Sequence, residues 1–80
     1  MHFVYVIRSI SFPEQIYIGQ TENVTRRMSS HNAGTSTHTS KYCPWEIVVS
    51  LEFKETDKAI LFEKYLKTCS GRAMIKKRFL

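Results

Sequence analysis

The stretch around residues 21–32 carries two polar side chains where helical spacing predicts core residues. Val24, Arg27, Met28 and His31 follow i, i+3, i+4, i+7 spacing and therefore share one face of the predicted helix. Val24 and Met28 suit a core, but burying an unpaired charge is costly, so Arg27 and His31 indicate a cleft or a paired site. An arginine at a cleft can hold a phosphate with two hydrogen bonds and stabilise its developing charge.

A carboxylate holds a similar position in a second predicted helix. Glu63 shares a face with Ala59, Phe62 and Leu66, all of them apolar. A single carboxylate can hold a hydrated Mg²⁺ ion, with phosphate oxygens as further ligands. The chain has seven acidic residues and only Glu63 has such a position, which disfavours a two-metal site.

Two tyrosines, Tyr5 and Tyr17, occur on two short predicted strands whose simplest pairing is an antiparallel hairpin. With Arg27, His31 and Glu63 they would form a cluster suited to phosphodiester hydrolysis, because a phenol or imidazole near a cation can help to deprotonate the attacking water. Two alternatives stay open. Arg27 and Glu63 could form an inter-helix ion pair or extend to solvent, and His31 could be an ordinary, partly buried histidine.

The elements that must position these residues are predicted from residue patterns. The pattern predicts strands over residues 2–8, 15–19 and 45–53, a helix capped by Thr21 and ending near Asn32 with Gly34 beyond it, and a helix capped by Thr56 that runs to about Cys69. Ser70-Gly71 is expected to break the pattern before a short basic helix from Arg72. The result is an α+β domain in which helices pack on a three-stranded antiparallel sheet.

Strict alternation makes the third strand the clearest of the three. It predicts that five apolar residues share one face, opposite Glu46, Ser50 and Glu52; these are Trp45, Ile47, Val49, Leu51 and Phe53.

Length and composition limit the class of protein. The 80 residues, 42% of them apolar and 24% charged, predict one globular domain over residues 1–80. No apolar run is long enough to cross a membrane and no signal peptide is evident, so we expect a cytoplasmic protein with no membrane partner. Cys43 and Cys69 are expected to be reduced and buried. A zinc site is not expected, since His31, His38, Cys43 and Cys69 match no standard ligand spacing.

The formal net charge is +5, and from Lys64 to the end the chain contains no acidic residue. Such a surface attracts polyanions, although a solvated helical face would give the same pattern. We expect DNA as the partner, with RNA not excluded, and basic residues as its contacts: Arg26, Lys41, Lys67, Arg72, Lys76 and Lys77.

Four ordered segments resemble the GIY-YIG nuclease superfamily, and together they cover essentially the whole chain. The paired tripeptides that name the superfamily are matched by Phe3-Val4-Tyr5 and Tyr17-Ile18-Gly19. Residues 19–32 resemble its helix with the catalytic arginine. Lys41-Tyr42 before Pro44-Trp45, and residues 62–67, are similar to its small stand-alone bacterial members.

The resemblance implies a role for each residue of the cluster. One of Tyr5 and Tyr17 would be the general base, Arg27 would stabilise the phosphate, Glu63 would bind the metal, and His31 would line the site. The implied reaction is hydrolysis of DNA dependent on one Mg²⁺ or Mn²⁺ ion, in repair or recombination and selective for DNA structure.

The chain departs from the family pattern at several positions. Phe3-Val4 replaces Gly-Ile, Gln20 stands where some repair-type members have a lysine, and Ser70-Gly71-Arg72 occupies the region of an asparagine found in some members. Because of these departures, two other functions stay open: a nucleic-acid-binding module without catalysis, and a protein-interaction domain. Gly19 fits the family pattern and is expected to end the second strand, where a side chain would crowd the phosphate. The oligomeric state stays open.

Overall fold

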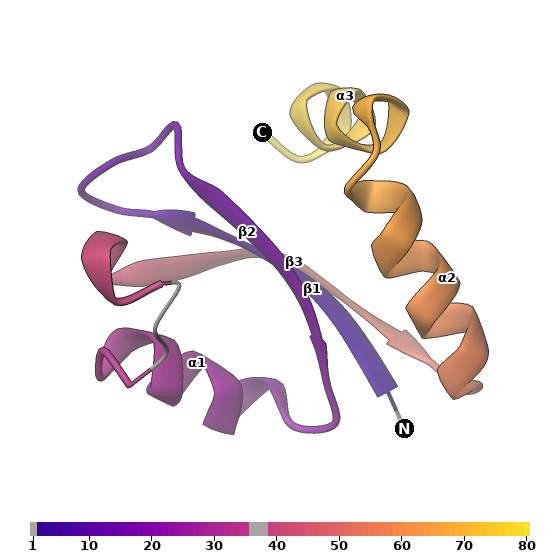
Figure 1. Cartoon of the computed structure of the whole chain (residues 1–80), viewed down its shortest axis with the longest axis horizontal. Helices are drawn as coiled ribbons and strands as arrows, with labels where there is room; N and C mark the ends of the chain where they lie inside the picture. Colours follow the sequence, from indigo (N-terminus) through magenta and orange to yellow (C-terminus); the bar gives the residue numbers. More distant parts are fainter. Residues whose placement is uncertain (1, 36–38) are drawn as a thin grey trace.

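Three antiparallel strands form the centre of the molecule in a computed structural model that describes residues 2–35 and 39–80. Strand β1 (His2–Ser9) lies between β2 (Ile16–Thr21) and β3 (Trp45–Phe53), in the order β2-β1-β3 (Figure 1). The predicted α+β class, the hairpin and the antiparallel sheet are confirmed. Strand β2 begins one residue later and ends two residues later than predicted.

The alternation of side chains along β1 creates two cores, one on each face of the sheet. Val4 and Val6 pack against α2 (Thr56–Leu66) and α3 (Cys69–Arg78). Tyr5 and Ile7 point the other way, toward the side covered by α1 (Val24–Asn32). Figure 1 shows α1 on one side of the sheet and the other two helices on the opposite side. Burial of apolar side chains on both faces of one central strand accounts for the three-layer arrangement.

A β-bulge in β3 overturns the prediction that its five apolar residues share a face. Ile7 of β1 is opposite Ile47, but the preceding Val6 is opposite Val49, so Val48 is an extra residue. An extra residue reverses the side to which all later side chains point. As a result, Trp45 packs in the core with Tyr5, whereas Val49 and Phe53 pack in the core with Val4.

The N-cap of helix α1 lies two residues later than predicted. Because β2 continues to Thr21, the N-cap is Asn23, whose side chain accepts a hydrogen bond from the Arg26 backbone N–H at 3.0 Å. The Thr21 hydroxyl instead accepts from the Asn23 backbone N–H at 3.1 Å. Gly34 follows the helix with φ +75°, so its predicted place just past the helix end is confirmed.

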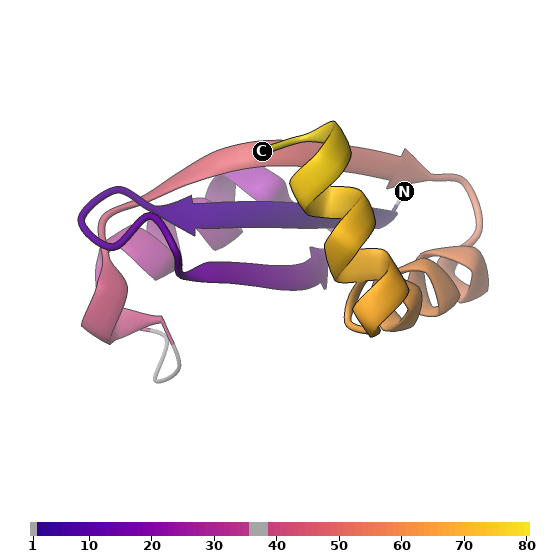
Figure 2. The ribbon, with the colours of Figure 1, turned by 90° about the horizontal axis from the view of Figure 1, so that it is seen from above.

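The two C-terminal helices meet at a boundary that the sequence places wrongly. Helix α2 ends at Leu66 rather than Cys69, and its N-cap is Glu55 rather than Thr56. Helix α3 begins at Cys69 because Thr68 caps it, accepting from the Gly71 backbone N–H at 3.1 Å. Ser70-Gly71 therefore lies inside α3 instead of breaking a helix. Figure 2 shows α3 turning sharply away from α2.

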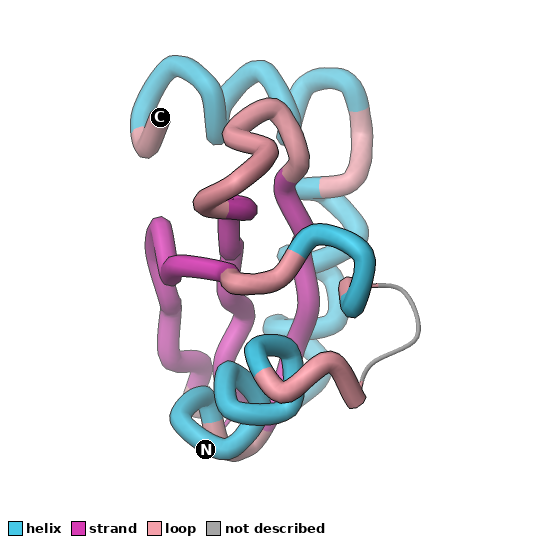
Figure 3. Tube along the Cα trace, turned by 90° about the vertical axis from the view of Figure 1, so that its left-hand side faces the viewer, coloured by secondary structure: helices cyan, strands magenta, loops and turns pink. Residues whose placement is uncertain are grey.

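The short η1 helix (Ser40–Tyr42) links the α1 side of the molecule to β3 (Figure 3). Both cysteines are free; Cys43 is half-buried and Cys69 is exposed, so the expected burial of Cys69 is wrong. Within the described residues no group of three or more His, Cys, Asp or Glu side chains could hold a metal ion, and no helix is long and apolar enough to cross a membrane. His38, one of the four residues tested for zinc-ligand spacing, lies outside those residues.

Candidate active site

A chain of three buried polar side chains lies on the α1 face of the sheet. The Tyr5 hydroxyl oxygen is 2.9 Å from His31 Nε2, and His31 Nδ1 is 2.7 Å from the Thr39 hydroxyl oxygen. Tyr5 is 1% exposed and His31 is fully buried. Burial lowers the pKa of His31, and the positive charge of Arg27 lowers it further. The imidazole is therefore neutral at pH 7, with one nitrogen that donates and one that accepts.

Arg27 and Tyr17 complete this group of side chains. The Tyr17 ring packs against both neighbours, with its centroid 5.2 Å from that of His31 and 6.3 Å from that of Tyr5. The Arg27 guanidinium interacts with the phenols of Tyr5 and Tyr17, and this interaction raises the pKa of Arg27. Burial raises the pKa of Tyr5, and Arg27 opposes that rise. Four of the five residues of the predicted cluster therefore lie together.

The absence of a side chain at Gly19 leaves space for the Tyr5 ring. It lies opposite Tyr5 in the hairpin register, inside β2 rather than at its end as predicted. A Cβ atom at Gly19 would lie 2.6 Å from the Tyr5 hydroxyl oxygen and 3.0 Å from Cε1 of Tyr17. A side chain at position 19 would therefore collide with the Tyr5 phenol, so the glycine is required even without a bound phosphate.

Glu63 reaches the same edge strand from the α2 face of the sheet. Its Oε1 accepts a hydrogen bond from the Gln20 side-chain amide at 2.7 Å, and Oε2 lies 3.2 Å from Lys67 Nζ. The Gln20 amide oxygen is in turn 2.6 Å from His2 Nε2. Gln20 thus holds the carboxylate of Glu63 from strand β2.

Arg27 and Glu63 do not form the inter-helix ion pair that the sequence left open. Within the described residues, the ion pairs are Arg8 with Glu46 and Lys67 with Glu63. Arg27 comes from α1 on one side of the sheet, and Glu63 comes from α2 on the other (Figure 1). The negative charge of Glu63 nevertheless contributes to the raised pKa of Tyr5, so Glu63 and Tyr5 interact electrostatically although they come from opposite faces of the sheet.

The surroundings of Glu63 fit an ion held through one carboxylate. The Glu63 side chain is 15% exposed, and each carboxylate oxygen with one protein partner keeps a second lone pair. Mg²⁺ keeps most of its water ligands and uses one or two carboxylates with substrate phosphates. An ion at Oε2 would have to replace the contact with Lys67, since two cations cannot share that oxygen without repulsion.

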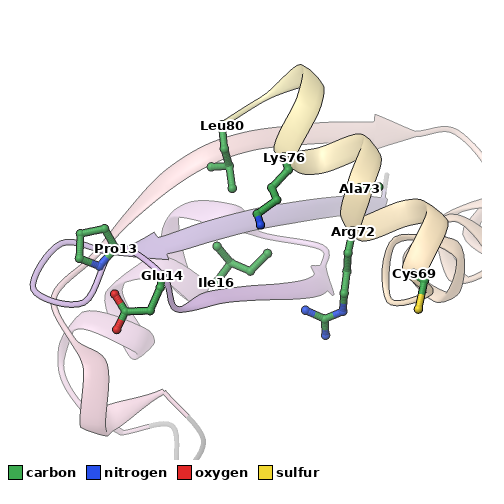
Figure 4. Close-up of a pocket in the computed structure, with 8 residues that line it drawn as sticks. All are labelled: Pro13, Glu14, Ile16, Cys69, Arg72, Ala73, Lys76 and Leu80. Atoms are coloured by element: carbon green, nitrogen blue, oxygen red, sulfur yellow. The ribbon is translucent and has the colours of Figure 1, made fainter.

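The basic residues expected to bind nucleic acid are spread over the molecule, and two of them line a hollow. Arg72 and Lys76 extend from α3 toward the strands, over a hollow of about 540 Å³ that also borders Glu14 in the β1–β2 loop (Figure 4). Arg26 and Lys41 are exposed on other elements, Lys77 is exposed on α3 outside the hollow, and Lys67 pairs with Glu63. Of the six predicted contacts, Arg72 and Lys76 are therefore the two that line the hollow on the α3 side of β2.

Three residues around the site were missed by the sequence reasoning: Thr39, Gln20 in its contact with Glu63, and His2. Thr39 lies beyond α1 in a stretch rich in Gly, Ser and Thr, where nothing distinguishes one hydroxyl from another. Parity along the hairpin could have placed Gln20 on the face opposite Tyr5, because Gln20 is opposite Val4.

Comparison with known proteins shows the family to which the chain belongs. The family model of the GIY-YIG catalytic domain matches residues 1–77, so the chain belongs to the GIY-YIG family. It is 35% identical over 71 residues to a structure-specific endonuclease subunit SLX1 from Debaryomyces hansenii. It is also 34% identical over 74 residues to an SLX1 homolog from Giardia intestinalis.

These matches cover 80% and 89% of the chain, but the chain spans only about a fifth of the length of the two relatives (20% and 21%). A solution NMR structure of a UPF0213 protein from Bacillus halodurans has a TM-score of 0.58, with 22% identity, over 98% of this chain and 85% of that one. At this identity the likeness shows a shared fold.

Proposed function

We propose that this domain is a metal-dependent DNA endonuclease that hydrolyses a phosphodiester placed at the edge of β2. The observation that carries the proposal is the convergence of Tyr5, Arg27 and His31 beside Gly19, with Glu63 at the same strand from the other face. The SLX1 relatives are named as structure-specific endonuclease subunits, which supports selection of branched or flapped DNA.

Each side chain has a chemical task in this proposal. Arg27 binds the scissile phosphate and stabilises the charge that develops on it. Tyr5 is the better placed of the two tyrosines to act as base, because His31 Nε2 at 2.9 Å can take its hydroxyl proton as the phenol oxygen takes one from water. Glu63 would hold one Mg²⁺ or Mn²⁺ ion, which when bound supplies positive charge at the phosphate oxygens.

One contact favours a second candidate function. The Lys67 ammonium lies 3.2 Å from Glu63 Oε2 and already neutralises the carboxylate. If that ion pair persists with DNA bound, the domain holds nucleic acid through its basic residues without cutting it.

Cleavage assays distinguish the two functions. Labelled single-stranded, duplex, flapped and branched DNA would be incubated with Mg²⁺ or Mn²⁺ and with wild type, Arg27→Ala or Glu63→Ala. We expect cleavage of branched DNA by the wild type, a loss of about 10²–10³-fold in rate for Arg27→Ala, and no cleavage with Glu63→Ala or with chelator.

Two matched variants serve as controls: Arg8→Ala, from an exposed ion pair with Glu46, and Glu52→Ala, an exposed carboxylate on β3. Both should cleave at the wild-type rate. A wild type that binds every DNA in a salt-sensitive manner and cleaves none would establish the binding module instead.

A further inference from the structure

Thr39 is a buried hydroxyl residue that contacts the site through His31. It is 1% exposed, and its hydroxyl oxygen lies 2.7 Å from His31 Nδ1. Its backbone carbonyl separately accepts a hydrogen bond from the Trp45 indole N–H at 2.9 Å. The backbone contact therefore anchors the residue to the core and leaves the hydroxyl group to serve His31.

The direction of the hydrogen bonds follows from the groups around Tyr5. The buried hydroxyls of Tyr5 and Thr39 both reach the imidazole, but a phenol is the stronger hydrogen-bond donor, and neighbouring Arg27 offers it no acceptor. Among the described residues, the hydrogen-bond partner of the Tyr5 hydroxyl is His31 Nε2, so the hydroxyl donates to that nitrogen. The neutral imidazole then carries its hydrogen on Nδ1 and donates it to the Thr39 hydroxyl oxygen.

We propose that Thr39 is a positioning residue that fixes the Nδ1–H tautomer of His31, so that Nε2 stays available to accept the hydroxyl proton of Tyr5. The catalytic meaning of this tautomer rests on the proposed function, whereas the tautomer itself does not. Thr39 touches neither phosphate nor metal in this scheme and acts only through His31.

Removing the hydroxyl group would favour the other tautomer. An Nδ1–H group without an acceptor in a buried place is costly, so the proton would move to Nε2. Nε2–H would then point at the Tyr5 oxygen, which would face donors from both His31 and Arg27 and could no longer pass on its own proton. Cleavage should suffer while the fold, which depends on the backbone of Thr39, is kept.

The test compares Thr39→Val, which has the same shape without the hydroxyl group, with Thr39→Ser, which retains it. Nitrogen-15 NMR of the His31 side chain measures which ring nitrogen carries the hydrogen. We expect Nδ1–H in the wild type and in Thr39→Ser, and a shift toward Nε2–H in Thr39→Val. The cleavage rate at saturating DNA should fall about 10–100-fold in Thr39→Val, with KM little changed, and recover in Thr39→Ser.

The wild-type spectrum alone can overturn the proposal, whether or not Thr39→Val folds. Nε2–H in the wild type, or an unchanged Nδ1–H in folded Thr39→Val, would show that Thr39 does not set the tautomer. The spectrum needs no DNA, so the two tests are independent. A wild type that cleaves no DNA would refute the proposed function, and the NMR spectrum would still decide whether Thr39 sets the tautomer of His31.

Discussion

At the scale of single residues, the polar side chains that the sequence predicts are those that interrupt an apolar pattern. Arg27, His31 and Glu63 are conspicuous because each occupies a helical position whose neighbours are core residues. Thr39 and Gln20 interrupt no pattern, and their contacts depend on where a loop and an edge strand come to lie in space. Spacing predicts which residues share a face but not which partner each one meets across the sheet.

Stability should depend on pH through His31. The lowered pKa means that the folded protein binds this proton less readily than the unfolded chain, whose histidine has a pKa of about 6.5. The stabilisation is therefore complete above that value and is lost as the pH falls through it toward the folded pKa.

Urea unfolding at pH 7.5, 6.5 and 5.5 measures the effect. As the pH is lowered from 7.5 to 5.5, we expect the free energy of unfolding to decrease in the wild type and in His2→Gln. The decrease should be smaller in His31→Gln. Equal falls in the wild type and in His31→Gln would show that the buried imidazole does not cause the dependence.

At the scale of elements, the junction between α2 and α3 is where the sequence is most misleading. Ser70-Gly71 resembles a break because glycine is a poor helix former. The structure instead places Gly71, fully inside α3, against the end of α2: a Cβ atom there would meet the Tyr65 carbonyl and lie 2.5 Å from the Leu66 Cα atom. The glycine permits a close approach of two helices, and composition alone does not separate that use from a break.

Replacing Gly71 by alanine should therefore destabilise the domain. In an ordinary helix the change would stabilise by up to about 1 kcal/mol, because alanine has the higher helix propensity. Here the obstacle is backbone that cannot rotate away, so we expect a loss of about 2–3 kcal/mol in the free energy of unfolding.

Its neighbour supplies the control for denaturant unfolding. Ser70→Ala, an exposed position in the same helix turn, should stay within about 0.5 kcal/mol of the wild type. A Gly71→Ala variant at least as stable as Ser70→Ala would mean that α2 and α3 can separate at this point.

At the scale of the whole molecule, charge is the property that the sequence shows most directly. A net charge of +5 and the absence of acidic residues after Glu63 are read without any structure. Composition could not show that Arg72 and Lys76 share a hollow beside β2, or that Lys67 is engaged by Glu63. The hollow depends on how α3 turns away from α2, whereas the ion pair follows from the four-residue spacing of Glu63 and Lys67 at the end of α2.

DNA binding should weaken with salt to a degree set by these cations. Removing one cation that neutralises a phosphate should reduce the slope of log K against log salt by about one. We expect a reduction of about two for the double variant Arg72→Ala/Lys76→Ala, measured by fluorescence anisotropy with a chelator present.

The double variant Lys54→Ala/Lys58→Ala removes the same charge from exposed residues that do not line the hollow beside α3, and it should leave the slope unchanged. Equal slopes for the two double variants would move the DNA-binding surface away from α3.

The bulge in β3 also has a consequence for how this sequence can change over time. Because one extra residue turns the strand over, the segment around Trp45 must suit the core beneath α1, and the segment from Val48 to Phe53 must suit the core beneath α2 and α3. Each half can accept compensating substitutions with its own helices. Deletion of the extra residue, Val48, would move Trp45 to the wrong side of the sheet. We therefore expect substitutions in this strand to be tolerated more readily than insertions or deletions.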